Sequence, residues 1–182
     1  MKRLFYAVCC LALAASMPAL AQHHPASDKA PMASAKAPMT DQQFVDFAAQ
    51  TDMVEANLGQ LAQNVALSPA VKDYGKMLQS DHTDDYGQLQ AAAQQASLTV
   101  PNAIDAEHNK STIGPMNKLK GAAFDHKYIA EMIAGHTKAI EIYKMEALEA
   151  QNQAIKSYAE TAVPVLQKHL DGAKDLQKDK TK

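Results

Sequence analysis

The sequence contains no tryptophan and only 5% aromatic residues, so it offers little surface for stacking against nucleic-acid bases. Lysine and arginine form no dense cluster before the C-terminal tail, which argues against binding to a phosphate backbone. The chain also lacks a glycine-rich phosphate loop, a Cys-x-x-Cys pair and a nucleophile elbow. Nucleic acid is therefore not an expected partner, and no known catalytic motif is present.

The only two cysteines, Cys9 and Cys10, lie in an apolar run near the start of the chain. Two basic residues precede this run and the small-residue stretch Ala19-Leu20-Ala21 follows it, which is the order of a secretory signal peptide. We expect residues 1–21 to be cleaved off, which leaves an exported, periplasmic chain without disulfides or thiolate metal ligands. No later apolar stretch approaches the length of about 20 residues that a membrane span requires, so no transmembrane segment is expected in the mature chain.

The mature chain of about 160 residues fits a single domain. Removal of Lys2 and Arg3 lowers the Lys plus Arg count from 18 to 16 against 20 Asp plus Glu, so the net charge changes from −2 to −4. Residues 22–40 are rich in Ala, Pro, Ser and Lys and lack apolar periodicity, which is typical of a disordered linker. We expect a folded domain over residues 41–178 and a Lys-rich tail over residues 179–182.

Apolar residues recur at steps of three and four in four long segments, as they do in amphipathic helices. The first segment begins at Thr40 or Asp41, either of which can cap a helix, with Gln43 near the reciprocal capping position, and it runs for about 25 residues. Its apolar stripe is Phe44, Phe47, Val54, Leu58, Leu61 and Val65. The second segment starts at Ser68 and Pro69, an N-cap followed by a proline at the first helical position, and ends near Ser97.

The third segment starts near Ala122, and the fourth follows the polar stretch 149–153. Pro164 lies inside the fourth segment and is expected to kink it or to divide it after Val163. The first two and the last two segments are joined by short links, whereas residues 98–121 form a longer mixed connection. We therefore predict an all-α fold, a ferritin-like four-helix bundle with a longer crossover between helices 2 and 3.

Each of the last three helices carries one histidine on its predicted buried stripe, and in the first helix Glu55 stands at the edge of the stripe. The candidate ligands are therefore Glu55, His82, His136 and His169. Facing helices of a bundle build metal sites in this way, and imidazole with carboxylate suits Zn, Cu, Fe or Ni. Asp81 and Asp125 are candidates for orienting the imidazoles from behind.

The alternative interpretation is that the three histidines are structural, each bonded to a backbone carbonyl or a carboxylate. Burial of three polar rings without a shared purpose costs free energy, which favours a metal site. A di-iron carboxylate centre is not indicated, because it requires Glu three residues before His and those positions hold Gln79, Ile133 and Leu166. Three further acids of the third helix are interpreted as a solvated face: Glu141, Glu146 and Glu149.

Signal cleavage gives a mature terminus of Gln22-His23-His24. A histidine at the third position binds Cu(II) or Ni(II) in the tetragonal geometry that those ions favour. His23 and His24 are therefore candidates for a separate terminal copper or nickel site. His108 and His126 are interpreted as surface or connection residues.

Four stretches together carry a resemblance to a known family: "FVDFAAQTDMVEANLGQLAQN", "VKDYGKMLQSDHT", "LKGAAFDHKYIAEMIAGHTKAIEIY" and "VPVLQKHL". They resemble the exported bacterial proteins called domain of unknown function 4142, over about residues 41–178. The resemblance implies a ferritin-like bundle and export, but it implies no reaction. The characteristic positions of the family fall here on Glu55, Asp81, His82, Asp125, His136 and His169.

Three functions are consistent with these patterns. The first is an exported metal-binding bundle that acts in metal buffering or envelope stress. The second is a structural or interaction protein of the cell envelope, with internally bonded histidines and a protein partner. The third is an oxidoreductase with an atypical His-rich site, although no motif indicates catalysis. Metal retained on purification separates the first from the second, and redox turnover separates the first from the third.

Overall fold

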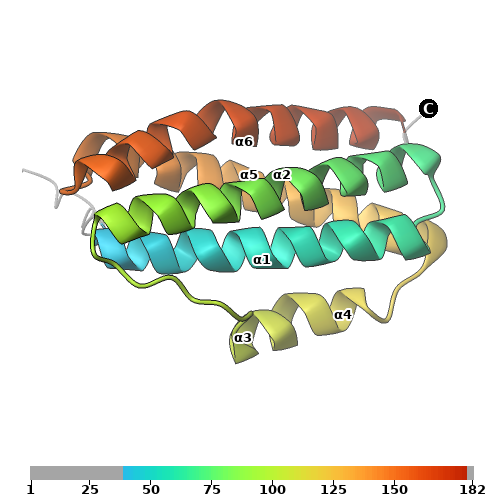
Figure 1. Cartoon of the computed structure of the whole chain (residues 1–182). Helices are drawn as coiled ribbons and strands as arrows, with labels where there is room; N and C mark the ends of the chain where they lie inside the picture. The colour runs from blue at the N-terminus through green and yellow to red at the C-terminus, as the bar shows by residue number, and fades with distance from the viewer. Residues whose placement is uncertain (1–38, 180–182) are drawn as a thin grey trace, which may run out of the picture. The chain divides into compact units, whose positions relative to one another are not determined.

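The computed structural model describes residues 39–179. The predicted signal peptide (residues 1–21), residues 22–38 of the predicted linker with His23 and His24, and residues 180–182 of the predicted tail lie outside the described residues. The elements are α1 (Asp41–Val65), α2 (Pro69–Gln95), α3 (Ala106–His108), the π-helical turn η1 (Asn109–Ile113), α4 (Gly114–Met116), α5 (Gly121–Glu149) and α6 (Gln153–Asp179). Over these residues the chain is an all-α bundle of four long helices with a long crossover between α2 and α5, which confirms the predicted fold class (Figure 1).

The four long helices form two pairs, each made of helices consecutive in the sequence, and the two pairs pack against each other. α1 packs mainly against α2, and α5 packs mainly against α6, while α2 with α6 and α1 with α5 complete the bundle. The crossover passes beside α1 and is bonded to it through Gln50. The side-chain NH2 group of Gln50 donates to the carbonyl of Ala103, and its side-chain oxygen accepts from the backbone N–H of Asp105. None of the helices in residues 39–179 is both long and apolar enough to span a membrane.

Of the two helix starts predicted from capping residues, one makes its capping bonds and the other does not. Thr40 and Gln43 form a reciprocal capping box at the start of α1, as predicted. Ser68 occupies the N-cap of α2, but its side chain makes no capping bond. The backbone N–H groups of Leu67 and Ser68 instead donate to the two carboxylate oxygens of Asp125, each at 3.0 Å. A residue of α5 therefore fixes the turn between α1 and α2.

Of the two effects expected of Pro164, division of the fourth helix is wrong, because α6 runs without interruption from Gln153 to Asp179, and the kink stays a prediction. A proline in a helix leaves the carbonyl four residues earlier without its usual donor, and here that residue is Glu160. Both Pro164 and Glu160 are exposed, so water can satisfy the freed carbonyl. The buried residues Ala162 and Leu166 on either side hold the helix against the core.

Two of the predicted helix faces are also corrected. The buried face of α1 is rotated from the predicted stripe: Phe47 and Leu61 are only half-buried, whereas Asp52 and Glu55 are buried. Glu146 was expected on a solvated face and is instead 4% exposed. Its burial, together with the neighbouring charges of Asp41 and Glu149, raises the pKa of Glu146 to about 7.

The apolar core consists of two clusters with a polar layer between them. One cluster includes Phe44, Leu89, Tyr143 and Ile155, and the other includes Leu58, Leu78, Phe124, Tyr128 and Met132. We define the polar layer as Asp52, Glu55, His82, His136 and His169, all of them buried. A buried layer of ionisable groups costs free energy unless its members pair with one another or bind an ion. The polar layer is therefore a candidate functional site.

Candidate metal centre

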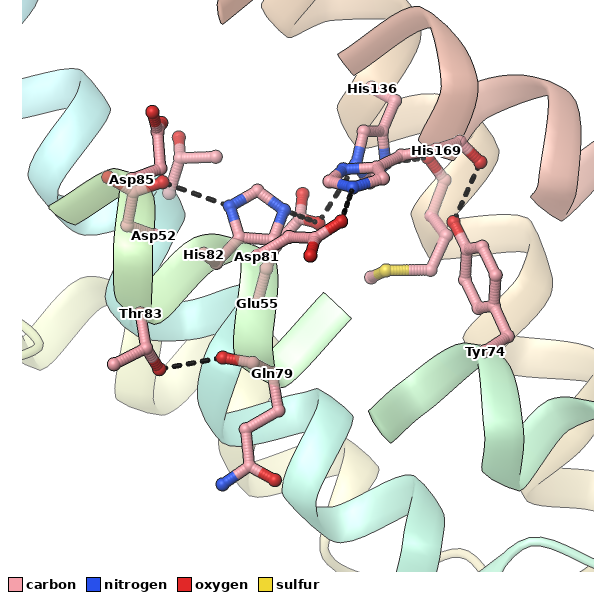
Figure 2. A network of polar contacts seen from close by, with 12 residues as sticks. Asp52, Glu55, Tyr74, Gln79, Asp81, His82, Thr83, Asp85, His136 and His169 are labelled. Carbon is pink, nitrogen blue, oxygen red and sulfur yellow. Dashed lines mark hydrogen bonds and ion pairs between the residues drawn. The ribbon is translucent and has the colours of Figure 1, made fainter. Parts of the chain in front are cut away.

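Three imidazoles from three different helices meet in the polar layer. One nitrogen from each of His82, His136 and His169 lies within 4.8 Å of the others, and the three side chains are at most 2% exposed (Figure 2). The ring centroids are 5.2 to 5.8 Å apart. The predicted histidines of α2, α5 and α6 therefore lie at the same height in the bundle.

Glu55 adds a carboxylate from α1 to this group. Its Oε2 lies 3.0 Å from Nε2 of His82 and 3.2 Å from Nε2 of His136. Each of the four long helices thus places one side chain in the centre, and the four residues singled out from the sequence lie together. His108 and His126 lie elsewhere: His108 of α3 bonds to Asp105, the N-cap residue of that helix, and His126 is exposed on α5.

The inner atoms of this group are close but unsatisfied. Among residues 39–179, no aligned hydrogen-bond partner exists for Nε2 of His82, Nε2 of His136, Nδ1 of His169 or Oε2 of Glu55. The short distances from Glu55 to two imidazoles are therefore ion-pair contacts rather than directed hydrogen bonds. Buried polar atoms are normally hydrogen-bonded, so four atoms without an aligned hydrogen bond, three of them held only by ion pairs at Glu55, leave a role for a further partner.

The outer nitrogen of each ring, in contrast, has a partner. Nδ1 of His82 lies 2.9 Å from Oδ1 of Asp52, and Nε2 of His169 lies 2.9 Å from Oδ2 of Asp81. Nδ1 of His136 lies 2.8 Å from the carbonyl of Met132. This carbonyl can only accept, so Nδ1 of His136 carries the hydrogen and donates it. Such outer bonds orient imidazoles that ligate metals.

Asp125, a predicted orienting partner of the imidazoles, instead bonds to the turn between α1 and α2. Its oxygens accept from the turn between α1 and α2, and all three outer imidazole nitrogens already have other partners. The orienting aspartate that sequence reasoning missed is Asp52. Its signal was the helical spacing of the true buried face of α1: Ala48, Asp52, Glu55, Gly59 and Ala62.

Other contacts tie this layer to its surroundings. The hydroxyl of Tyr74 on α2 donates to the backbone carbonyl of His169 at 2.9 Å. The hydroxyl of Tyr158 donates to Oδ2 of Asp85 at 2.8 Å and lies 3.3 Å from the hydroxyl of Tyr143. These bonds link α2 to α6 and α6 to α5, on either side of the imidazoles.

The pKa values of His82 and His169 are shifted in opposite directions. Burial works against charge on His82, but the carboxylate of Glu55 and the hydrogen bond to Asp52 raise the pKa of His82 to about 10. Burial also opposes charge on Glu55, yet the charges of His136 and His82 hold the pKa of Glu55 down at about 2. Burial lowers the pKa of His169 to about 4 and raises the pKa of Asp52 to about 7. At neutral pH, His169 therefore keeps a free lone pair.

The residues present fit a small transition-metal ion in donor type and in spacing. Metal–ligand bonds of about 2.0–2.1 Å place two tetrahedral ligands about 3.3 Å apart. The two distances from Glu55 are close to this value, and the histidine nitrogens, within 4.8 Å of one another, would have to approach one another by up to about 1.5 Å. Three imidazoles and one carboxylate are a donor set for Zn, Cu, Fe or Ni.

Residues 26–176 match the family described as "Domain of unknown function (DUF4142)". A search among curated proteins finds no match. Among solved structures, the chain is similar to "CopM in the Cu(II)-bound form" with a TM-score of 0.65 and 15% identity, over 78% of this chain and 98% of that chain. It is similar to "CopM in the Cu(I)-bound form" with the same score and identity, over 78% and 97%. For "CopM in the Ag-bound form (by co-crystallization)" the TM-score is 0.60 at 15% identity, over 78% and 97%. At this level of identity, the similarity establishes a shared fold.

Proposed function

The chain belongs to the DUF4142 family, and we propose that it is an exported bundle protein that binds one transition-metal ion in its polar layer. The ligands are His82, His136 and His169, with Glu55 as the carboxylate. The observation that carries the proposal is the convergence of four buried ligand side chains from four helices, whose inner atoms make no aligned hydrogen bond among residues 39–179. We place the protein in the periplasm, with a role in metal buffering or envelope stress.

The surroundings of the imidazoles favour binding over turnover. The void beside His82 and His169 has a volume of about 10 Å³, which is close to the space taken by one water molecule. An organic substrate does not fit there. The second carboxylate of the layer, Asp52, lies behind His82 and bonds to its outer nitrogen, so it does not bridge two ions as a di-iron centre requires.

Copper is the first ion to test. Imidazole and carboxylate donors suit Cu(II) as well as Zn(II), and affinity generally rises towards copper in the divalent series. The structural neighbours are described as bound to Cu(II), Cu(I) and Ag, which supports the same class of ion here. The ion would bind inner atoms that otherwise make no aligned hydrogen bond, while Asp52, Asp81 and the Met132 carbonyl hold the rings in place.

The test is metal content and titration of the full chain carrying His23→Ala and His24→Ala, purified without an affinity tag. These two changes remove the separate terminal site. We expect one Cu(II) or Zn(II) per chain, and ligand concentrations 100-fold above Kd should stabilise the fold by about 2.7 kcal/mol. His82→Ala and His136→Ala should each reduce the bound metal.

His126→Ala is the matched control, because His126 is exposed on the same helix as His136 and lies outside the group of three histidines. It should leave the metal content unchanged. One ion per chain retained in both the His82 and the His136 variants would remove the polar layer as the binding site. Absence of metal in the starting chain, even after reconstitution, would favour the structural interpretation of the histidines.

A further inference from the structure

An acidic cleft lies on the surface between α2 and α6, next to the polar layer. It has a volume of about 270 Å³, and its lining includes Asp81, Asp84 and Asp85 of α2. The lining contains one cationic side chain, Lys168 of α6. A cleft lined mainly by one sign of charge raises the local concentration of ions of the opposite sign. This cleft therefore favours cations.

The cleft leads inward to the imidazoles. The void of about 10 Å³ beside the rings shares four lining residues with the cleft: Asp81, Asp85, Ala162 and Val165. Its remaining lining includes His82 and His169. Nδ1 of His169 is buried and lacks a hydrogen-bond partner among residues 39–179. A candidate ligand that has one buried nitrogen without a hydrogen bond thus lines the inner end of a passage that starts at a group of carboxylates.

Asp81 connects the two ends of this passage. Its side chain is 31% exposed, and its Oδ2 lies 2.9 Å from Nε2 of His169, which is 1% exposed. Asp81 is therefore accessible from the cleft while in contact with a candidate ligand (Figure 2). Val165 lines both the cleft and the inner void, so it stands where the two meet, and it is 42% exposed.

We propose that the acidic cleft between α2 and α6 is the route by which a hydrated divalent cation reaches the polar layer. Asp84 and Asp85 attract the ion, Asp81 holds it at the mouth, and the ion then passes Val165 to His169 and His82. The inference rests on the proposed metal-binding function and adds to it the direction from which the ion arrives.

The first test measures the rate of Cu(II) binding by stopped-flow quenching of tyrosine fluorescence, in the chain with His23→Ala and His24→Ala. Val165→Phe narrows the passage without touching a ligand. It should slow association and dissociation by the same factor, roughly tenfold, and leave Kd and the number of bound ions unchanged. Leu148→Phe is the matched control, because Leu148 is 76% exposed and lies outside the cleft.

The second test uses charge. Asp84→Lys should slow association roughly tenfold at low ionic strength, and added salt should reduce the difference. Asp73→Lys makes the same change of net charge at an exposed position of α2 outside the cleft, and it should bind at the original rate. Original rates and one ion per chain in both the Val165 and the Asp84 variants would overturn the route alone. No binding in the starting chain would overturn the proposed function and the route with it.

Discussion

Oδ1 of Asp52 on α1 lies 2.9 Å from Nδ1 of His82 on α2, and both side chains are at most 2% exposed. This bond turns the opposite nitrogen of His82 towards Glu55 and the other two imidazoles. Asp52 therefore sets the orientation of a candidate ligand without being one. The relationship explains why an acidic residue is buried on a helix that contributes no histidine.

Asp52→Asn keeps the shape of this side chain and removes its charge. We expect metal affinity to fall roughly 10- to 100-fold, as is typical when a partner behind a metal-ligating histidine is altered. Competition with a chromophoric chelator measures this change. Asp73→Asn, at an exposed position of α2, is the control. Equal affinity in the Asp52 variant and the starting chain would show that His82 does not depend on this bond for binding.

The raised pKa of His82 predicts a pH dependence for the metal-free protein. The folded state binds the His82 proton more tightly than the unfolded state, whose pKa is near 6.5. The resulting stabilisation is complete below about pH 6.5 and is lost as the pH rises towards about 10. Urea unfolding midpoints in the presence of a chelator should therefore fall across this range.

His82→Gln tests the assignment of this alkaline loss, because glutamine remains polar but cannot titrate. In that variant the decline between pH 6.5 and 10 should become shallower. The lowered pKa of His169 has the opposite sign, so its contribution is present above about pH 6.5 and is lost as the pH falls towards about 4. A decline of unchanged steepness in the His82 variant would place the alkaline titration on another group.

Gly59 and Gly75 determine how closely α1 approaches α2. A Cβ atom on Gly59 would lie 2.5 Å from the carbonyl oxygen of Gly75, which is backbone and cannot move aside as a flexible side chain would. Gly59→Ala should therefore destabilise the fold by about 1–3 kcal/mol, as overpacking of a core typically does. Chemical denaturation measures the loss.

Gly87→Ala provides the comparison for that change. Gly87 is exposed on α2, and a Cβ built there meets no other atom within 4 Å. Alanine at this position should stabilise the helix by about 0.5–1 kcal/mol, because glycine loses more backbone entropy on folding. If Gly59→Ala were as stable as Gly87→Ala, the helices would not depend on this close approach.

The sequence by itself determined the helices and which residues could share the interior. Periodicity gives the direction of each side chain around a helix axis, so it placed His82, His136 and His169 on buried faces. Loop lengths then gave the pairing of the helices, and the absence of Glu-x-x-His spacing argued against a di-iron centre.

Only the tertiary structure decided what lies at one height in the bundle. A shift of one residue moves a side chain 1.5 Å along the axis and about 100° around it, and the sequence of one helix does not fix its offset against another. Close packing at Gly59 and Gly75 sets which face of α1 lies against α2. This face places Asp52 behind His82 and Glu55 at the centre of the polar layer. The same packing assigned Asp125 to the turn between α1 and α2, because that turn presents two backbone donors to its carboxylate.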